Sequence, residues 1–353
     1  MAYTTIDDPS AHFHTELYTG DGQDNRTVTN SANAGDFKPD WLWIKERSAT
    51  SHHRLFDSSR GVSKRLATSN NEAEVSDSSN HKTFDTDGFT VGTSGSVNAN
   101  SDTYAAWQWK ANGGTTSSNG NGSVTSTVQA NTTAGFSIVT YTGTGSGNTI
   151  GHGLGVTPDL IIVKVRSTTN NWGVWHKDLG GPNYYLKLNT TDSTITATDV
   201  WNNTLPTSTV FSTGAAGTTN DSGATYVAYC FAEKKGYSKF GKFRGNANAD
   251  GPFIYTGFKP SCLMIKNIGA SGTGYHWYIW DNKRDTINVM DNTLHGDENN
   301  AENTFDQDID FLSNGFKLRG SGVGMNPNSH DAIYFAFAEH PFVSSKGVPV
   351  TAR

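Results

Sequence analysis

Hydrophobic residues gather in short bursts that recur three times along this 353-residue chain. Each burst runs from a proline to a lysine six positions later: Pro39-Asp-Trp-Leu-Trp-Ile-Lys45, Pro158-Asp-Leu-Ile-Ile-Val-Lys164 and Pro260-Ser-Cys-Leu-Met-Ile-Lys266. A nearly continuous apolar run of this length, rich in Ile, Val and Trp, predicts a strand that is buried on both faces. The proline stands where a strand can begin, because it has no N–H to donate within a ladder.

A second pattern closes each copy and alternates bulky with smaller side chains. The bulky positions are Ala105, Trp107 and Trp109, then Val227, Tyr229 and Phe231, then Ile333, Phe335 and Phe337. The interleaved positions are Ala106 and Gln108, then Ala228 and Cys230, then Tyr334 and Ala336. A period of two predicts a strand with its bulky face in a core and its tighter face elsewhere. Upstream, a turn leads into another predicted strand at Gly88-Phe89, Val210-Phe211 and Gly315-Phe316.

The three copies predict the domain organisation. Their bursts lie more than 100 residues apart, far beyond solenoid or propeller periods, so we expect each copy to be a domain with its own core. The predicted fold is all-β: three tandem β-sandwich domains, jelly-roll or lectin-like, that arose by internal triplication. The predicted parts are an N-terminal arm (1–15), repeat 1 (16–112), a Gly/Ser/Asn linker (113–122), repeat 2 (123–236) and repeat 3 (237–353). These repeats are named segments 1, 2 and 3 below.

The two remaining parts carry weaker signals. The composition of the linker predicts a flexible or extended tether. The arm precedes the repeated pattern, and two alternatives stay open for it: it docks on a partner, or it is frayed.

Composition and charge narrow the class of protein. The chain has 38 Gly, 18 Phe, 13 Tyr and 9 Trp with long Ser, Thr and Asn tracts, which favours short strands in polar loops. A net charge of −6 without a basic cluster argues against nucleic-acid binding. No run approaches the roughly 20 apolar residues of a membrane helix, and no signal-peptide core stands at the N-terminus, so we expect a soluble protein that is not secreted by the usual route. Cys230 and Cys262 fall in different predicted cores and are expected to be free.

The search for catalytic and metal-binding patterns predicts no catalytic residue, no metal site and no cofactor. The 11 histidines match no metal-binding spacing, which leaves open only a site assembled from distant segments. Asp85-Thr-Asp87-Gly88 begins like a calcium loop but lacks the distal Glu, so a tight turn is expected. A glycan-cleaving enzyme would need convergent carboxylates, and the best candidates are Asp178, Asp192 and Asp199.

Aromatic residues beside polar stretches are the candidate ligand-binding residues. They are Trp172, Tyr184, Tyr185, Trp201, Tyr275, His276 and Trp277. Aromatic faces with Asn and Asp neighbours bind sugars through stacking and hydrogen bonds. The alternative is that each ring closes the end of a sandwich. The stretches around Asp57, His176 and Asp281 and the loops after them differ in length and chemistry between the copies. We interpret them as three docking or recognition faces on a common scaffold.

Five motifs, taken as a set, carry a resemblance. They are Pro39-Asp-Trp-Leu-Trp-Ile-Lys45, Arg54-Leu-Phe-Asp-Ser-Ser-Arg-Gly61, Phe84-Asp-Thr-Asp-Gly-Phe89, Tyr104-Ala-Ala-Trp-Gln-Trp-Lys-Ala-Asn-Gly-Gly114 and Gly135-Phe-Ser-Ile-Val-Thr-Tyr-Thr-Gly-Thr-Gly145. Over residues 12–342 the chain resembles an uncharacterised repeat family found in predicted tail-fibre and virion structural proteins of marine tailed phages. The family has no established catalytic residues to transfer.

The resemblance implies a non-enzymatic virion structural protein of a tailed bacteriophage, a tail fibre or capsid decoration used in host-surface adhesion. It would be assembled in the host cytoplasm and lie on the virion surface. The expected partners are other virion proteins, through the N-terminal arm, a host-surface glycan, and further copies of the chain, with a homotrimer favoured. The alternative function is a carbohydrate-active depolymerase or a stand-alone lectin.

Overall fold

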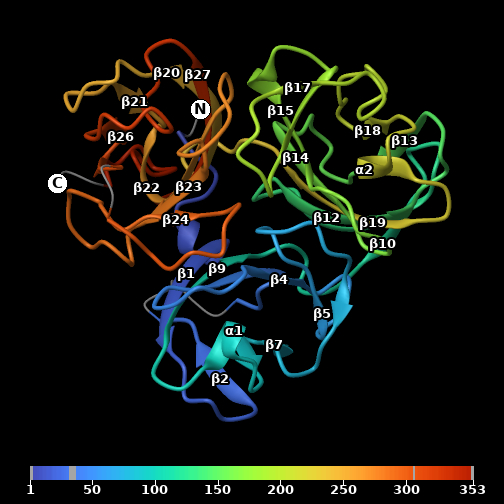
Figure 1. The fold of residues 1–353 in the computed structure, drawn as a ribbon, viewed down its shortest axis with the longest axis horizontal. Helices are drawn as coiled ribbons and strands as arrows, with labels where there is room; N and C mark the ends of the chain where they lie inside the picture. Colours follow the sequence, from blue (N-terminus) through green and yellow to red (C-terminus); the bar gives the residue numbers. More distant parts are fainter. Residues whose placement is uncertain (1–2, 32–36, 305–306, 351–353) are drawn as a thin grey trace.

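Three lobes surround a common centre in the computed structural model, which describes residues 3–31, 37–304 and 307–350 (Figure 1). The lobes follow the chain: segment 1 is blue to cyan, segment 2 green to yellow, and segment 3 orange to red. The fold is mostly β, as predicted, and the strands pair antiparallel in every sheet. None of the described helices is long and apolar enough to cross a membrane.

Each segment contributes one large sheet. In segment 1 its order is β1 (Phe13–Thr19), β9 (Thr103–Trp109), β3 (Trp41–Glu46) and β4 (Arg54–Asp57). In segment 2 it begins with β10 (Ser117–Asn119), which the linker adds at the edge. The order continues with β11 (Ser126–Asn131), β12 (Phe136–Thr142), β19 (Thr225–Phe231), β14 (Leu160–Val165), β15 (Gly173–His176), β16 (Tyr184–Lys187) and β17 (Ile195–Thr196). In segment 3 it is β20 (Ser238–Arg244), β27 (Asp331–Pro341), β22 (Phe258–Asn267), β23 (Trp277–Asp281) and β24 (Leu294–His295).

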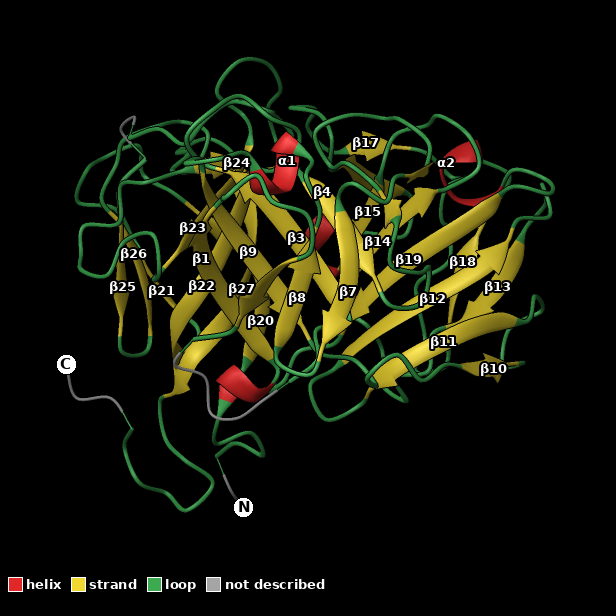
Figure 2. Ribbon diagram, turned by 90° about the horizontal axis from the view of Figure 1, so that it is seen from below, coloured by secondary structure: helices red, strands yellow, loops and turns green. Residues whose placement is uncertain are grey.

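Smaller sheets pack against the large ones (Figure 2). They are β2 (Arg26–Thr29), β8 (Gly88–Val91) and β7 (His81–Asp85) in segment 1, β13 (Asn148–Gly151) and β18 (Val210–Thr213) in segment 2, and β21 (Phe253–Tyr255), β26 (Gly315–Leu318) and β25 (Ile309–Leu312) in segment 3. A two-stranded sheet joins β5 (Lys64–Arg65) to β6 (Val75–Ser76). The short helices are η1 (Pro9–Ala11), α1 (Gly95–Asn98), η2 (Lys177–Leu179) and α2 (Gly217–Asn220).

The burst strands are buried on both faces, as the sequence predicts. In β3, Leu42 and Ile44 face a core between the two sheets of segment 1, whereas Trp41 and Trp43 face a second core. β14 and β22 divide their side chains in the same way. Pro260 departs from the expected position, because it lies inside β22 at a β-bulge rather than ahead of the strand.

The second core is shared by all three segments. All nine bulky side chains of the closing strands β9, β19 and β27 lie in this shared core. The smaller apolar side chains between them face the local core of their own segment. At its centre the rings of Trp109, Phe231 and Phe337 form a triangle, with centroids 6.5, 5.5 and 5.8 Å apart. The alternation therefore predicts the bulky face correctly, but the face packs between segments rather than within one.

The predicted linker and arm are both built into this body. Strand β10 lies within the linker and pairs with β11, and Gly113 N donates to Asp40 Oδ2 at 2.8 Å. From the arm, Ile6 enters the shared core, and Tyr3 Oη donates to Gly257 O of segment 3 at 2.8 Å. The linker is thus not a free tether, and the described part of the arm docks on its own chain.

A buried asparagine fixes the same loop in each segment. Asn98, Asn220 and Asn326 are fully buried, and each side-chain amide donates to two carbonyls and accepts one backbone N–H. Because a buried amide without partners is costly, these positions tolerate few other residues.

Candidate functional site

The contacts between the segments form a closed ring. Strands β4, β15 and β23 each pair with a burst strand. At the start of each of them, a side-chain ring nitrogen forms a hydrogen bond with a backbone carbonyl of another segment. The pairs are His53 Nε2 with His295 O at 2.9 Å, Trp172 Nε1 with Ala67 O at 2.8 Å, and Trp277 Nε1 with Lys187 O at 3.0 Å. His53 Nδ1 accepts from Trp43 Nε1 at 2.7 Å, so its Nε2 carries the hydrogen and donates. Segment 1 thus bonds to segment 3, segment 3 to segment 2, and segment 2 to segment 1.

Backbone hydrogen bonds close a second ring in the opposite sense. They are Glu74 N to Arg166 O at 2.8 Å, Thr194 N to Ile268 O at 3.0 Å, and Glu302 N to Arg47 O at 2.9 Å. Each segment is therefore hydrogen-bonded to both of the others. We name the contacts the 1/2, 2/3 and 3/1 interfaces.

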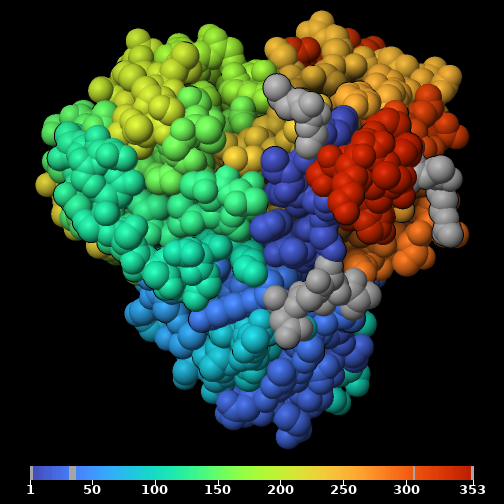
Figure 3. Space-filling model, turned by 180° about the vertical axis from the view of Figure 1, so that it is seen from behind, coloured from blue at the N-terminus to red at the C-terminus, as the bar shows by residue number. Residues whose placement is uncertain are grey.

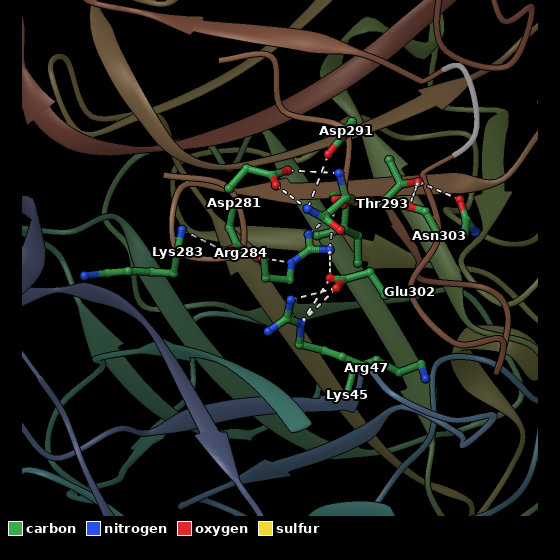
Figure 4. A network of polar contacts seen from close by, with 12 residues as sticks. Lys45, Arg47, Asp281, Lys283, Arg284, Asp291, Thr293, Glu302 and Asn303 are labelled. Carbon is green, nitrogen blue, oxygen red and sulfur yellow. Dashed lines mark hydrogen bonds and ion pairs between the residues drawn. The ribbon is translucent and has the colours of Figure 1, made fainter. Parts of the chain in front are cut away.

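A buried charge network lies in the 3/1 interface (Figure 4). Arg284 Nε is 2.6 Å from Asp281 Oδ2, and Arg284 Nη1 is 2.9 Å from Glu302 Oε1. Glu302 also pairs with Arg47 of segment 1 at 2.7 Å, and Trp107 of segment 1 donates to Asp281 Oδ2 at 3.0 Å. Burial opposes the charge of Arg284, but Asp281 and Glu302 outweigh it and raise the pKa of the guanidinium.

The 1/2 interface repeats this network. Arg60 pairs with Asp57, and its Nη1 lies 2.9 Å from Glu74 Oε2. Glu74 in turn pairs with Arg166 of segment 2 at 2.8 Å, and Tyr229 of segment 2 donates to Asp57 Oδ2 at 2.7 Å. In each network, a buried Asp–Arg pair belongs to one segment, and the next segment contributes an arginine and an aromatic hydrogen-bond donor.

Neutral residues occupy the equivalent places of the 2/3 interface. Asp57, His176 and Asp281 share one register position, because each pairs with the residue two positions after the burst proline of its sheet. The other equivalents, by the same register and spacing, are Leu179, Thr194, Ile268 and Phe335. Burial lowers the pKa of His176 to about 3, so it is neutral at pH 7, and its Nδ1 accepts from Asp178 N at 3.1 Å.

The lysines that end the bursts are fully buried in all three segments. Burial lowers the pKa of Lys45, Lys164 and Lys266 to about 8. Their ammonium groups donate to backbone carbonyls, for example Lys164 Nζ to Asn170 O at 2.9 Å. Each burst strand therefore carries a carbonyl-bound lysine one residue before its end.

The structure scatters the seven candidate ligand-binding residues. Trp172 and Trp277 belong to the interface ring, and Tyr185 and Trp201 lie buried in the local core of segment 2. His276 is also buried, whereas Tyr184 and Tyr275 are half-buried. A sugar cannot stack on a ring face that is packed inside the protein. The burial of five of the seven favours the packing alternative for those five.

Asp57, His176 and Asp281 do not themselves form recognition faces, and the loops that follow them stay a prediction in that role. The exposed fractions of these three residues are 0%, 0% and 1%, because they lie between segments where the networks form. A signal for this role was present in the sequence: Asp followed by Arg three residues later occurs in segments 1 and 3 but not in segment 2. That spacing lets the arginine fold back onto its own aspartate.

An open cleft of about 580 Å³ lies in segment 3. Its lining includes Lys259 and Glu339, paired at 2.7 Å, and Asp285, whose pKa is raised by burial. The three candidate enzyme carboxylates belong to segment 2 and do not line it. Of these, Asp192 pairs with Lys187 at 3.0 Å and Asp199 is exposed.

Comparison with known proteins gives a family but no activity. No curated protein matches the chain. A family model described as a domain of unknown function, DUF7483, matches residues 8–341. Since this match spans nearly the whole chain and all three segments, the protein belongs to the DUF7483 family.

Proposed function

We propose that the protein is a non-enzymatic structural protein on the surface of a tailed-phage virion, and that its segments are β-sandwich units produced by triplication. The observation that supports this most is the closed ring of interfaces around one shared core. The recurring residues of the sequence serve packing and contacts between segments. Such a body holds three sets of loops in fixed relation, which suits a structural or adhesive role in which several weak contacts add up.

The two faces of the body differ in what they present. Helices α1 and α2, together with β24 and its loops, lie along one face, whereas the chain approaches both of its ends on the other (Figure 2). On that second face the blue N-terminal stretch lies beside the red C-terminal one (Figure 3), and Ser345 N donates to Asp7 Oδ1 at 2.6 Å. We assign attachment to other virion proteins to this second face and contact with a host-surface glycan to the loop face.

The ring also bears on the expected homotrimer. The surfaces that join one segment to the next are all occupied within a single chain. A homotrimer would therefore form through the outer surface of the lobes and not by repeating the contacts between segments.

Immunogold labelling of purified particles of the encoding phage tests the proposal. An antibody raised against the full chain should decorate tail or capsid, and absence of label on intact and partly disrupted particles would remove the virion assignment. Incubation of the protein with host-surface polysaccharide distinguishes the alternatives: shortening of the polysaccharide would favour a depolymerase. Glycan binding without particle labelling would favour a stand-alone lectin.

A further inference from the structure

Two histidines and a glutamate converge where segment 3 meets segment 1. His276 stands just before β23, His295 ends β24, and Glu298 follows in the next turn. The ligand atoms of the three side chains all lie within 4.8 Å of one another. The three residues are brought together by the pairing of β23 with β24, which sets Tyr278 opposite His295.

The distances already approach those of a coordination sphere. Glu298 Oε1 lies 3.5 Å from His276 Nε2, and Glu298 Oε2 lies 3.2 Å from His295 Nδ1. Zinc ligands at about 2.0–2.1 Å from the ion stand about 3.4 Å apart in a tetrahedral arrangement. The carboxylate is therefore placed to share one ion with both imidazoles.

A second carboxylate orients the first imidazole. Asp297 Oδ2 accepts from His276 Nδ1 at 2.9 Å, and Asp297 Oδ1 is fixed by Trp277 N at 2.9 Å. This bond puts the hydrogen of His276 on Nδ1 and leaves the Nε2 lone pair facing Glu298. Carboxylate-to-histidine contacts of this kind hold metal-binding imidazoles in proteins.

Of the two imidazoles, His295 is held by fewer hydrogen bonds to groups outside the site. The rings of His276 and His295 are nearly parallel, at an interplanar angle of 5° and a centroid distance of 4.4 Å. A shared ion requires one ring to turn from this stack. His295 Nε2 is buried and has no hydrogen-bond partner among the described residues, so turning this ring breaks no hydrogen bond of Nε2. It gives up the contact with Glu298, which is itself a ligand, the stack on His276 and the edge contact with Tyr278.

We propose that His276 Nε2, His295 Nδ1 and the Glu298 carboxylate bind one zinc-type divalent cation, with water in the fourth position. Two imidazoles and one carboxylate form a donor set that zinc accepts, and magnesium prefers oxygen ligands instead. The side chain of Glu298 is 32% exposed, which gives the ion and its water a path from solvent.

Both flanks of the proposed metal site contact segment 1, at the 3/1 interface. His295 O meets His53 Nε2 of segment 1, and Asn299 O accepts from Ser51 N at 2.8 Å, so both flanks of the site contact segment 1. Ala67 and Lys187 take the place of His295 in the other two segments, as carbonyl acceptors of the same ring. A bound cation would therefore stabilise the 3/1 interface and no other.

Zinc competition against a chromophoric chelator, on the metal-stripped full chain, tests the site. We expect one tight site per chain, a loss of affinity of at least tenfold in His295→Ala and Glu298→Gln, and a 10- to 100-fold loss in Asp297→Asn. His330→Ala leaves the three ligands and Asp297 in place, so it is the matched histidine control and should bind as the unmodified chain does. Glu298→Gln keeps the shape of the side chain, so it separates loss of a ligand from loss of the fold.

Thermal unfolding provides a second readout. Zinc should raise the Tm of the unmodified chain and of His330→Ala but not that of Glu298→Gln, and an equal concentration of magnesium should raise neither. Absence of a stoichiometric zinc site, or equal zinc affinity in Glu298→Gln and the unmodified chain, would overturn the proposal. An equal rise in Tm with magnesium would overturn the assignment to a zinc-type ion.

Discussion

The 3/1 and 2/3 interfaces join equivalent surfaces with different chemistry. In the 3/1 interface, Asp281 and Arg284 form a fully buried ion pair that extends through Glu302 to Arg47. In the 2/3 interface the corresponding residues are His176, Leu179, Thr194 and Ile268. Yet both interfaces keep the ring nitrogen to carbonyl bond, the backbone hydrogen bond and the buried lysine.

The difference teaches that the charge networks are not what closes the ring. A buried ion pair loses much of its attraction to desolvation, and well-packed neutral residues of similar volume are often as stable. Once the network is present, however, each member depends on the others, because a lone buried charge is strongly destabilising. The apolar shared core and the two hydrogen-bonded rings are common to all three interfaces and carry the architecture.

The largest effect is expected from breaking one charge network. Arg284→Met leaves Asp281 and Glu302 without their buried partner and should lower the free energy of unfolding by about 3–5 kcal/mol. The matched change in the neutral interface, Leu179→Met, should cost less than about 1.5 kcal/mol. Urea unfolding of both variants measures the difference, and equal costs would contradict the contrast between the interfaces.

A pH effect is expected from His176 in the neutral interface. The pKa of His176 is about 3 in the folded protein, against 6.5 when it is exposed, so the unfolded chain binds more protons below pH 6.5. Its contribution to stability is therefore fully present above pH 6.5 and is lost as the pH falls toward 3. Between pH 7 and pH 4 the unmodified chain should therefore lose about 2–3 kcal/mol more of its free energy of unfolding than His176→Asn does. Identical pH profiles of urea midpoints would show that His176 titrates normally.

A smaller effect is expected at the aromatic donor. Tyr229→Phe removes the hydrogen bond to Asp57 but leaves the Arg60 contact, so it should cost about 1–2 kcal/mol. The reverse change, Phe335→Tyr in the neutral interface, meets no carboxylate and should bring no gain. Chemical unfolding measures both variants, and an unchanged stability of Tyr229→Phe would contradict a stabilising role for the hydrogen bond to Asp57.

The smallest net effect is expected from exchanging one interface for the other. A variant with Asp281→His, Arg284→Leu, Glu302→Thr, Arg47→Ile and Trp107→Phe gives the 3/1 interface the residues of the 2/3 interface. Its stability should stay within about 2 kcal/mol of the unmodified chain, above that of Arg284→Met alone. A cost larger than that of the single substitution would show that the networks are required for closure.

Much of the fold follows from periodicity in the sequence. The bursts and the alternating strands at Trp107, Tyr229 and Phe335 predict the central strands and the burial of both their faces. Periodicity states that a face is buried but not what covers it, and so the shared core was missed. Each buried lysine has a carbonyl partner within nine residues, and Asn98, Asn220 and Asn326 each join a carbonyl six residues earlier to one more than 70 residues away. They were missed because these contacts depend on how the backbone turns, which periodicity does not describe.

The candidate site was predicted less well, for a related reason. Loop position suggested exposure for Trp172 and Trp277, but the large rings fill the space between segments. His276, His295 and Glu298 come from a strand pairing that no local spacing reveals. Only the repeated Asp-to-Arg spacing carried information on the interfaces.

Native-state hydrogen exchange in increasing urea tests the central claim, that the three segments form one body around a shared core. The slowest amides of β9, β19 and β27 should converge on one common free energy of opening, because unfolding any segment exposes the core of all three. Three separate free energies, one for each segment, would contradict the claim and indicate independent domains.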